Sequence, residues 1–242
     1  QQARDAAEKI NADIKELPSV IDMASALSGS NFVHDEIGTN QCYDWGWIED
    51  NREATDNAIK NAHHVTTLEL VNNRLVPNAM EPRCSIADYN PANDDYTLYT
   101  TSQNPHLTRL LISAFVLGIP ENKLTVVSPD VGGGFGSKIY HYGEEALVLA
   151  AAKRIKRPVR WTATRSESFM TDAHGRDHVT KIELALDKDN NFLAFRTETM
   201  ANVGAYLSNF STVTPTILHG TLMAGNYAVP NVYVNVKTVF TN

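Results

Sequence analysis

Cysteine is scarce in this chain of 242 residues, which contains only Cys42 and Cys84. The two lie far apart and form no Cys-x-x-Cys pair, so thiols of this chain cannot by themselves hold an iron–sulfur cluster or a zinc ribbon. The spacing leaves a disulfide between them open. Two separate buried thiols, as in a cytoplasmic protein, are the favoured alternative.

The chain also lacks an excess of positive charge and long hydrophobic runs. Its net charge of −7 argues against sequence-independent binding of nucleic acid, which needs a basic face. No apolar run approaches the roughly 18 residues of a membrane span. No signal peptide is visible, but the chain begins at Gln1 rather than Met, so we expect it to belong to a longer protein. A hydrophobic content of 43% predicts a real core.

Three familiar catalytic and nucleotide-binding motifs are absent. A Walker A loop needs Gly-Lys-Ser/Thr, whereas here Ser137 precedes Lys138 and Ile139 follows. A dinucleotide fingerprint needs glycine three positions after Gly134, where Ser137 stands. No Gly-x-Ser-x-Gly elbow exists for a hydrolase nucleophile. A conventional phosphate loop and a serine hydrolase are therefore not indicated.

What the chain does have is a glycine-rich loop, residues 130–138, between an apolar strand pattern and a helix pattern. We expect it to expose backbone N–H groups at a helix N-terminus, where the dipole favours anionic groups. Glycine lets a backbone approach a ligand closely, and Phe135 is larger than a phosphate loop normally carries. The loop therefore looks built around something larger than a phosphate. A structural turn rich in glycine is the alternative.

Hydrophobic periodicity predicts an α+β fold with an antiparallel meander near its C-terminal end. Residues 28–46 are expected to form a connector, with a domain boundary near Asn40. The helix over 107–117 is expected to be buried and to end at Gly118, and a hairpin turn is expected at 187–191. The predicted helices are 3–12, 55–61, 107–117 and 144–154, and the predicted strands are 14–22, 66–71, 85–89, 97–101, 124–127, 159–163, 180–186, 192–199 and 232–240.

Histidine pairs could indicate a metal site. His174 and His178 would share one face of a helix, but Gly175 lies between them and no third ligand is evident, so a structural loop is favoured. His63 and His64 precede a strand, where adjacent side chains point to opposite faces. His141 follows the glycine loop, and capping or packing is favoured over a role in a site.

Charged residues at the two ends of the helix 144–154 have plain explanations. Glu144 and Glu145 suit a helix N-terminus through the dipole and are not needed as a general base. The basic run 153–157 suits the C-terminal end and indicates a solvated surface.

Four segments together resemble one family, in their order and approximate spacing. They are Met80-Glu81-Pro82, residues 101–106 (Thr-Ser-Gln-Asn-Pro-His), the glycine loop 130–138, and residues 227–231 (Tyr-Ala-Val-Pro-Asn). The chain resembles the large, molybdenum-binding subunit of the xanthine oxidase family, and most of all the large subunits of aerobic carbon monoxide dehydrogenase and its relatives. The resemblance covers nearly the whole chain. It implies the partial α+β molybdenum-cofactor-binding domain of a molybdenum hydroxylase.

The resemblance also implies roles for matched residues. Gln103 matches a glutamine that hydrogen-bonds an oxo group of the molybdenum centre. Gly133, Gly134, Phe135 and Gly136 match the loop beside the metal, with the Phe135 N–H directed at an oxo ligand. Such donors orient a metal's ligands without replacing them. No side chain of this chain is expected to bind molybdenum, because the pterin supplies a dithiolene, and no catalytic residue is expected within the 242 residues.

Cofactors, partners and domains follow from the same resemblance. It implies a molybdopterin carried as the cytosine dinucleotide, with FAD and 2Fe-2S centres in a medium and a small partner subunit. A small-molecule substrate, a dimer of heterotrimers and a cytoplasmic location are expected. Residues 1–40 would be the end of a hammerhead-type α/β domain plus connector, and 41–242 a truncated first molybdopterin-binding domain.

The resemblance places further machinery beyond Asn242: an arginine loop, most of the dinucleotide-binding surface and a base glutamate. The isolated chain is therefore expected to be inactive and to hold no cofactor firmly. Ile139 stands where purine-oxidising members have a glutamate, and Leu218 or His219 where they use an arginine. Purine is disfavoured, and carbon monoxide, aldehydes and aromatic heterocycles remain. The competing hypothesis is a non-catalytic domain that serves subunit assembly or scaffolding.

Overall fold

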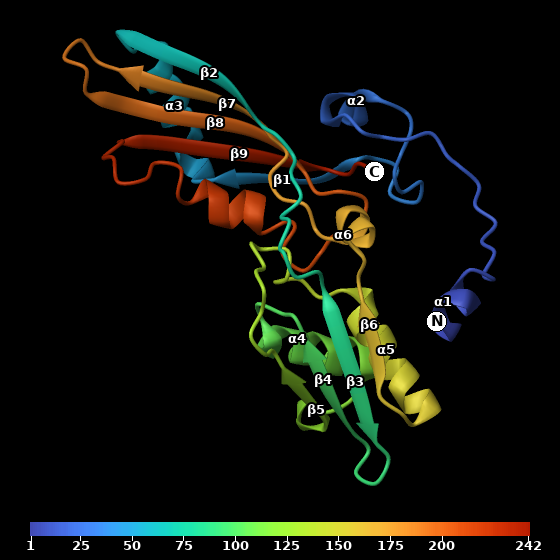
Figure 1. The fold of residues 1–242 in the computed structure, drawn as a ribbon. Helices are drawn as coiled ribbons and strands as arrows, with labels where there is room; N and C mark the ends of the chain where they lie inside the picture. The colour runs from blue at the N-terminus through green and yellow to red at the C-terminus, as the bar shows by residue number, and fades with distance from the viewer.

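The structure, a computed structural model, describes residues 1–242 and consists of two lobes, each built on its own β-sheet (Figure 1). The strands are β1 Gln41–Trp47, β2 His64–Asn72, β3 Cys84–Asn90, β4 Asp95–Thr100, β5 Leu124–Val127, β6 Val159–Thr162, β7 His178–Leu186, β8 Phe192–Asn202 and β9 Asn231–Val239. The helices are α1 Gln2–Ala7, α2 Met23–Ser28, α3 Arg52–Lys60, α4 Pro105–Leu111, α5 Gly143–Ile155 and α6 Arg165–Thr171, with short turns of helix η1 Glu49–Asn51, η2 Ile112–Leu117, η3 Glu121–Lys123 and η4 Thr214–Leu218.

The first lobe is a five-stranded sheet in the order β1-β9-β8-β7-β2. Its neighbours pair antiparallel except β8 and β9, which are parallel. The β7–β8 hairpin closes where the Asp187 carboxylate accepts hydrogen bonds from the N–H groups of Asp189 and Asn191, which confirms the predicted turn. Helix α3 packs against β8 and β9.

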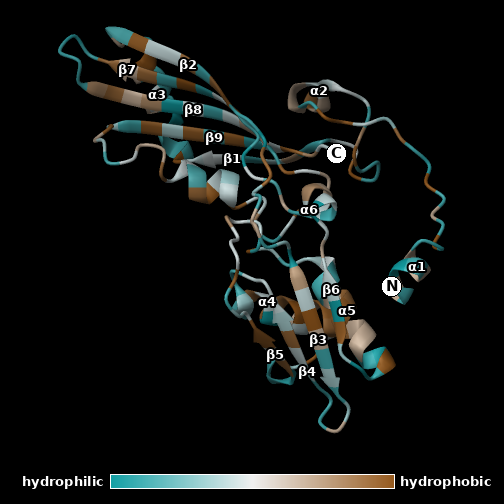
Figure 2. Cartoon of the chain, viewed as in Figure 1, coloured by the Kyte–Doolittle hydropathy of each residue, from teal (hydrophilic) through white to brown (hydrophobic).

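The second lobe is a four-stranded sheet in the order β5-β4-β3-β6, with β4 and β5 parallel. Helix α5 packs against β3. The largest core of the molecule lies here and is built around Leu98, Ile112, Leu124 and Leu149. Figure 2 shows hydrophobic and hydrophilic residues alternating along strands such as β3 and β9, as expected where only one face of a strand meets the core.

The chain passes between the lobes twice. It leaves the five-stranded sheet after β2 to enter β3, and it returns from β6 through α6 to β7 (Figure 1). The two crossings bring residues 73–83 and 163–177 together at the junction, where Leu75 and Gly175 form an isolated antiparallel bridge. The junction therefore gathers segments that are distant in sequence.

Most predicted elements are present. The helix predicted over 107–117 is formed by α4 and η2 and ends at Gly118, whose φ of 62° is the left-handed cap that glycine favours. Only one side of this helix is buried, because Ile112 is enclosed while Phe115 is exposed. Cys42 and Cys84 are both free, but they are half-buried rather than buried as expected. None of the helices is long and apolar enough to cross a membrane.

The predicted strand over 14–22 is wrong. These residues form no regular element, and Ile14, Leu17 and Ile21 are exposed. Their pattern suits a strand, but no neighbouring strand offers hydrogen bonds to them. A strand exists only through such pairing.

Two further predictions near the N-terminus are corrected. The helix predicted over 3–12 ends at Ala7, and the predicted connector over 28–46 contains most of β1. Strand β1 lies at the sheet edge and pairs only with β9, so it is half-exposed and shows no clean alternation of hydrophobic residues. Helix α6 was not predicted, although Thr164 and Glu167 form a capping box, which is a sequence signal for the start of a helix.

The enclosed position of Leu98 predicts a large cost for its truncation. We expect Leu98→Ala to lower the free energy of unfolding by about 2–5 kcal/mol, because it removes buried methyl groups and leaves a cavity. Leu147→Ala on α5, where the side chain is 67% exposed, is the control and should change stability by less than about 0.5 kcal/mol. Urea denaturation measures both, and equal losses would contradict the placement of this core.

Candidate functional site

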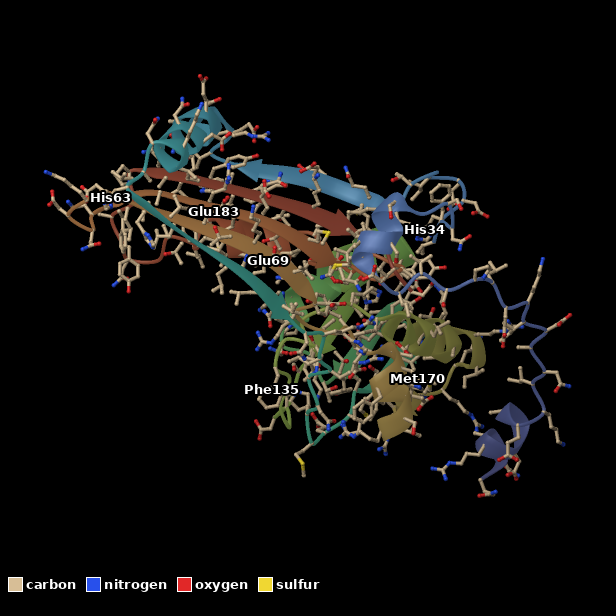
Figure 3. The ribbon with its side chains drawn as sticks, turned by 90° about the horizontal axis from the view of Figure 1, so that it is seen from above. His34, His63, Glu69, Phe135, Met170 and Glu183 are labelled. Carbon is tan, nitrogen blue, oxygen red and sulfur yellow. The ribbon has the colours of Figure 1, made fainter.

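The glycine loop lies between β5 and α5 and contains several left-handed residues. Gly133 and Gly136 have φ values of 95° and 94°, and Phe135 has a φ of 53°. A φ near 95° is open to glycine and strained for other residues. The Phe135 side chain is 74% exposed, and Figure 3 shows it apart from Glu69 and Glu183 on the five-stranded sheet. The conformation turns Phe135 out of the fold.

Gln103, which follows β4 in the second lobe, holds this loop in place through three hydrogen bonds. Its side-chain Oε1 accepts hydrogen bonds from the N–H groups of Gly136 (3.0 Å) and Lys138 (3.3 Å), and its own N–H donates to the Lys138 carbonyl (2.9 Å). A Cβ on Gly134 would overlap the Gln103 carboxamide, so only glycine permits the contact. Because Oε1 is used by the loop, the amide orientation is determined. The Nε2 group donates to no atom of the chain.

The tip of the loop, residues 133–136, leaves two backbone donors free. The N–H groups of Gly134 and Phe135 donate to no atom of the chain, while those of Gly133, Ser137 and Ile139 bond to nearby carbonyls. Together with Gln103 Nε2, the loop therefore offers three neutral donors without acceptors. Donors of this kind suit oxygen atoms that carry negative charge.

The loop donors are not at a helix N-terminus, which corrects the sequence expectation. Helix α5 begins at Gly143, and at its first turn the Glu145 carboxylate accepts the Tyr142 N–H at 3.2 Å. The dipole of α5 therefore acts at the cap of the helix and not at the loop donors. The free donors arise from left-handed loop geometry instead.

A half-buried ion pair joins the start of the loop to its end. Lys138, only 2% exposed, donates from Nζ to the Glu81 carboxylate at 2.9 Å. The same carboxylate accepts the Gly132 N–H (2.8 Å), and the Glu81 N–H donates to the Gly132 carbonyl. Burial opposes ionisation of Glu81, but the bonds from Lys138 and Gly132 outweigh it and lower the carboxyl pKa. The Glu81 carboxylate therefore stays charged at neutral pH.

Arg83 joins the second lobe to the segments beside the loop. Its Nε donates to Asp172 (2.6 Å), its Nη1 to Glu144 (3.1 Å), and its guanidinium lies 3.6 Å from the Tyr142 ring centroid. Burial disfavours the Arg83 charge, yet the two carboxylates outweigh this and raise its pKa. The Tyr142 hydroxyl donates to the Ser137 carbonyl and accepts the Ala173 N–H. One charged cluster thus ties β3, α5 and the end of α6 to the loop.

A cavity of about 650 Å³ lies at the junction of the lobes, against the glycine loop. This volume is typical of a ligand site. Phe135 and Gly136 form part of its wall, whereas Gln103, Gly133 and Gly134 do not line it. Other wall residues come from the two crossings and from the segment after β8, including Arg74, Met170, Asp172, His174, Arg176, His178, Asn202, Leu218 and His219.

Two histidines on the cavity wall are held neutral. His178 on β7 and His219 after η4 lie edge to face, with ring centroids 5.5 Å apart. Burial, and then the neighbouring His219, lower the pKa of His178 to about 4. Burial also lowers the pKa of His219, whose buried Nε2 has no hydrogen-bond partner.

The histidines form no metal site. His174 bonds to Arg74 and to the Phe169 carbonyl, and no group of three His, Cys, Asp or Glu residues could hold a metal ion. His141 contacts Glu145 at 3.0 Å, which agrees with the favoured packing role.

The sequence prediction placed five site residues, and the structure brings Gln103, Gly133, Gly134, Phe135 and Gly136 together in one contact. It missed Lys138, Arg83 and Arg74 as supporting residues. Glu81 was noticed only within its segment and without a role. The carboxylate partners of Lys138 and Arg83 lie 57 or more positions away, so no local pattern pointed to these contacts.

Comparison with known proteins identifies the family of this chain. Residues 33–242 match the model of the molybdopterin cofactor-binding domain. The chain belongs to this family. Its relatives are molybdenum enzymes of the xanthine oxidase type.

Three relatives illustrate the match. The carbon monoxide dehydrogenase large chain of Hydrogenophaga pseudoflava is 33% identical over 99% of this chain. The nicotine 6-hydroxylase large subunit of Paenarthrobacter nicotinovorans is 30% identical over 84%. The crystal structure of quinoline 2-oxidoreductase from Pseudomonas putida 86 superposes over 99% of this chain with a TM-score of 0.87 and 30% identity.

The chain spans less than a third of each relative: 31% of the first, 24% of the second and 30% of the third. Two of them are described as a large chain or a large subunit, and so belong to assemblies of several subunits.

The low pKa of His178 predicts acid sensitivity. Between about pH 6.5 and 4 the unfolded chain binds a proton at this position and the folded chain does not, so the free energy of unfolding falls as pH falls through this window and is flat above it. The contribution is at most about 3 kcal/mol. We expect His178→Gln to flatten this part of the stability–pH curve. His106→Gln, an exposed histidine on α4, should leave the curve as in the wild type, and a matching change in both variants would contradict the assignment.

Proposed function

We propose that this chain is the cofactor-binding part of the large subunit of a molybdenum hydroxylase. The observation that carries the proposal is the set of three donors without acceptors, Gln103 Nε2 and the N–H groups of Gly134 and Phe135. Of these three residues, Phe135 lines a cavity of ligand size, in a chain that belongs to the molybdopterin cofactor-binding family.

The residues present fit the proposed cofactor. All three donors are neutral and none is a side chain that would enter a metal's coordination sphere, so they can orient oxo groups held by a pterin-bound metal. When bound, a molybdopterin supplies two-electron oxidation chemistry, with oxygen derived from water. The chain itself positions the donors. Gln103 and Glu81 hold the loop in place, and the loop conformation orients the N–H groups of Gly134 and Phe135.

The roles of the five residues are proposed as follows. Gln103 donates from Nε2 to an oxo group, and Phe135 donates from its N–H to another. Gly133 and Gly136 allow the left-handed turns that expose these donors. Gly134 provides the space that the Gln103 carboxamide occupies.

The proposed substrate is carbon monoxide, an aldehyde or an aromatic N-heterocycle. The relatives are described as a carbon monoxide dehydrogenase, a nicotine 6-hydroxylase and a quinoline 2-oxidoreductase. Ile139 does not line the cavity, and Leu218 and His219, which do, place no positive charge there at neutral pH. A purine would therefore lack the glutamate and the arginine that the resemblance assigns to these positions in purine-oxidising members.

Finer features are proposed from the family alone. They are a cytosine dinucleotide form of the pterin, FAD and 2Fe-2S centres on medium and small partner subunits, a dimer of heterotrimers and a cytoplasmic location. The division into a hammerhead-type end over 1–40 and a first molybdopterin-binding domain over 41–242 is also proposed. The base and the remaining cofactor contacts would come from other parts of the large subunit.

Metal content tests the proposal directly. The full-length protein that contains this chain, expressed in a host that assembles the cofactor, should purify with stoichiometric molybdenum and a pterin released on denaturation. Elemental analysis and pterin fluorescence measure the two. A folded protein without molybdenum would contradict the proposal and favour the competing hypothesis, a non-catalytic domain that serves assembly.

Gln103→Glu tests the donor role more sharply than truncation. The change keeps the Oε1 acceptor that holds the loop and removes the Nε2 donor. Loss of a hydrogen bond to a charged group costs about 1.5–3 kcal/mol, so turnover in the full-length enzyme should fall by about tenfold to a hundredfold. The unfolding temperature should change little.

Gln41→Glu on β1, an exposed glutamine far from the loop, is the matched control and should retain turnover. If Gln103→Glu lowered stability as much as activity, Gln103 would be a structural residue.

A further inference from the structure

Two exposed arginines, brought close by the backbone register, line the cavity at the junction of the lobes. Arg74 follows β2 and Arg176 precedes β7. The Leu75–Gly175 bridge, with N–H to O distances of 3.2 and 2.9 Å, continues the register in which Asn72 pairs with His178. That register places Arg74 directly across from Arg176. Both line the 650 Å³ cavity.

Neither arginine has a carboxylate partner, since no ion pair in the chain includes Arg74 or Arg176. The two carboxylates on the cavity wall are engaged elsewhere: Asp172 with Arg83 at 2.6 Å, and Asp177 with the Asn202 side chain at 2.7 Å. Both arginines are exposed, so their guanidinium groups are open to an anion in the cavity.

His174 orients the Arg74 guanidinium through a hydrogen bond, in a way that suits binding of an anion. His174 Nε2 donates to the Phe169 carbonyl (3.2 Å), which leaves Nδ1 as the acceptor for Arg74 Nε (2.6 Å). The Nε position of the guanidinium is thereby used, and both Nη groups stay free. Two parallel N–H groups of an arginine match the two oxygens of a carboxylate or phosphate.

The strand register, the missing carboxylates and the oriented guanidinium point to one site. We propose that Arg74 and Arg176 bind an oxyanion group of the molecule that occupies the cavity. The inference rests on the proposed function for what that molecule is. A phosphate of the nucleotide carried by the cofactor and a carboxylate of the substrate share the required chemistry. Phe135 and Gly136 line the same cavity, so a ligand held at the arginines extends towards the glycine loop.

Anion binding to the cofactor-free, full-length protein tests the site without molybdenum. The probes are inorganic pyrophosphate and benzoate, titrated calorimetrically at constant ionic strength. Arg74→Gln and Arg176→Gln should each weaken binding of the preferred probe by about tenfold or more, because each removes a hydrogen bond to a charged group. Arg157→Gln, an exposed arginine outside the cavity, should bind as the wild type does.

A stability measurement guards against variants that fail to fold. Arg176→Gln, at an exposed position, should leave the unfolding temperature of the cofactor-free protein nearly unchanged. Pyrophosphate or benzoate should raise that temperature more in the wild type than in Arg176→Gln. Arg176→Lys keeps the charge and loses the paired N–H groups, so it should fold and bind with intermediate affinity.

The outcomes separate the two sources of the oxyanion. Stronger pyrophosphate binding, with less nucleotide released on denaturing the loaded Arg74→Gln enzyme, assigns the phosphate. Stronger benzoate binding with unchanged nucleotide content assigns a substrate carboxylate. A wild type that binds neither probe, or variants that bind as it does, overturn the inference.

These results are independent of the molybdenum test. Arginine-dependent anion binding in a protein that never contains molybdenum would refute the proposed function and keep the anion site. A molybdenum-containing enzyme whose arginine variants bind both probes normally would refute the anion site alone.

Discussion

The carboxamide oxygen of Gln103, which accepts hydrogen bonds from the Gly136 and Lys138 N–H groups, is the contact on which the site depends. It fixes the loop to the end of the second lobe and determines which way the amide points. It also explains Gly134, because a side chain there would occupy the same space. Once this contact forms, the free Gln103 Nε2 and the free loop amides are neighbours, and their chemistry follows from that placement.

The contact is supported by charges buried at the junction of the lobes. Lys138 bonds to Glu81, and Arg83 bonds to Asp172 and Glu144. Breaking a buried pair by removing one partner is costly, because the remaining charge stays desolvated. These pairs therefore resist rearrangement of the segments they join. A loop that must present backbone donors in one orientation benefits from such resistance.

The cavity wall shows two kinds of basic residue with different chemistry. His178 and His219 are kept neutral by burial, so they offer rings and lone pairs. Arg74 and Arg176 remain charged and lack carboxylate partners. The wall is thus apolar and neutral on one part and cationic on another. A ligand with an aromatic or pterin body and an anionic end would match both parts.

Much of the fold and the outline of the site could be predicted from the sequence. Alternating hydrophobic residues located nearly all the strands, and Gly118 located the end of a helix. The glycine pattern and Gln103 located the loop, because only glycine tolerates the backbone angles and the close contact found there. These features depend on residues that are close together in the chain, so local sequence patterns predict them.

What only the tertiary structure decided involves partners distant in the chain. A strand-like pattern over 14–22 yields no strand, because pairing depends on a neighbour that the pattern does not specify. Arg74 lies across from Arg176 only through the register of β2 with β7, and Lys138 meets Glu81 across 57 positions. The sequence by itself determined which backbone conformations and donors are available. Long-range packing decided which charges meet, since those contacts form only when both lobes are folded together.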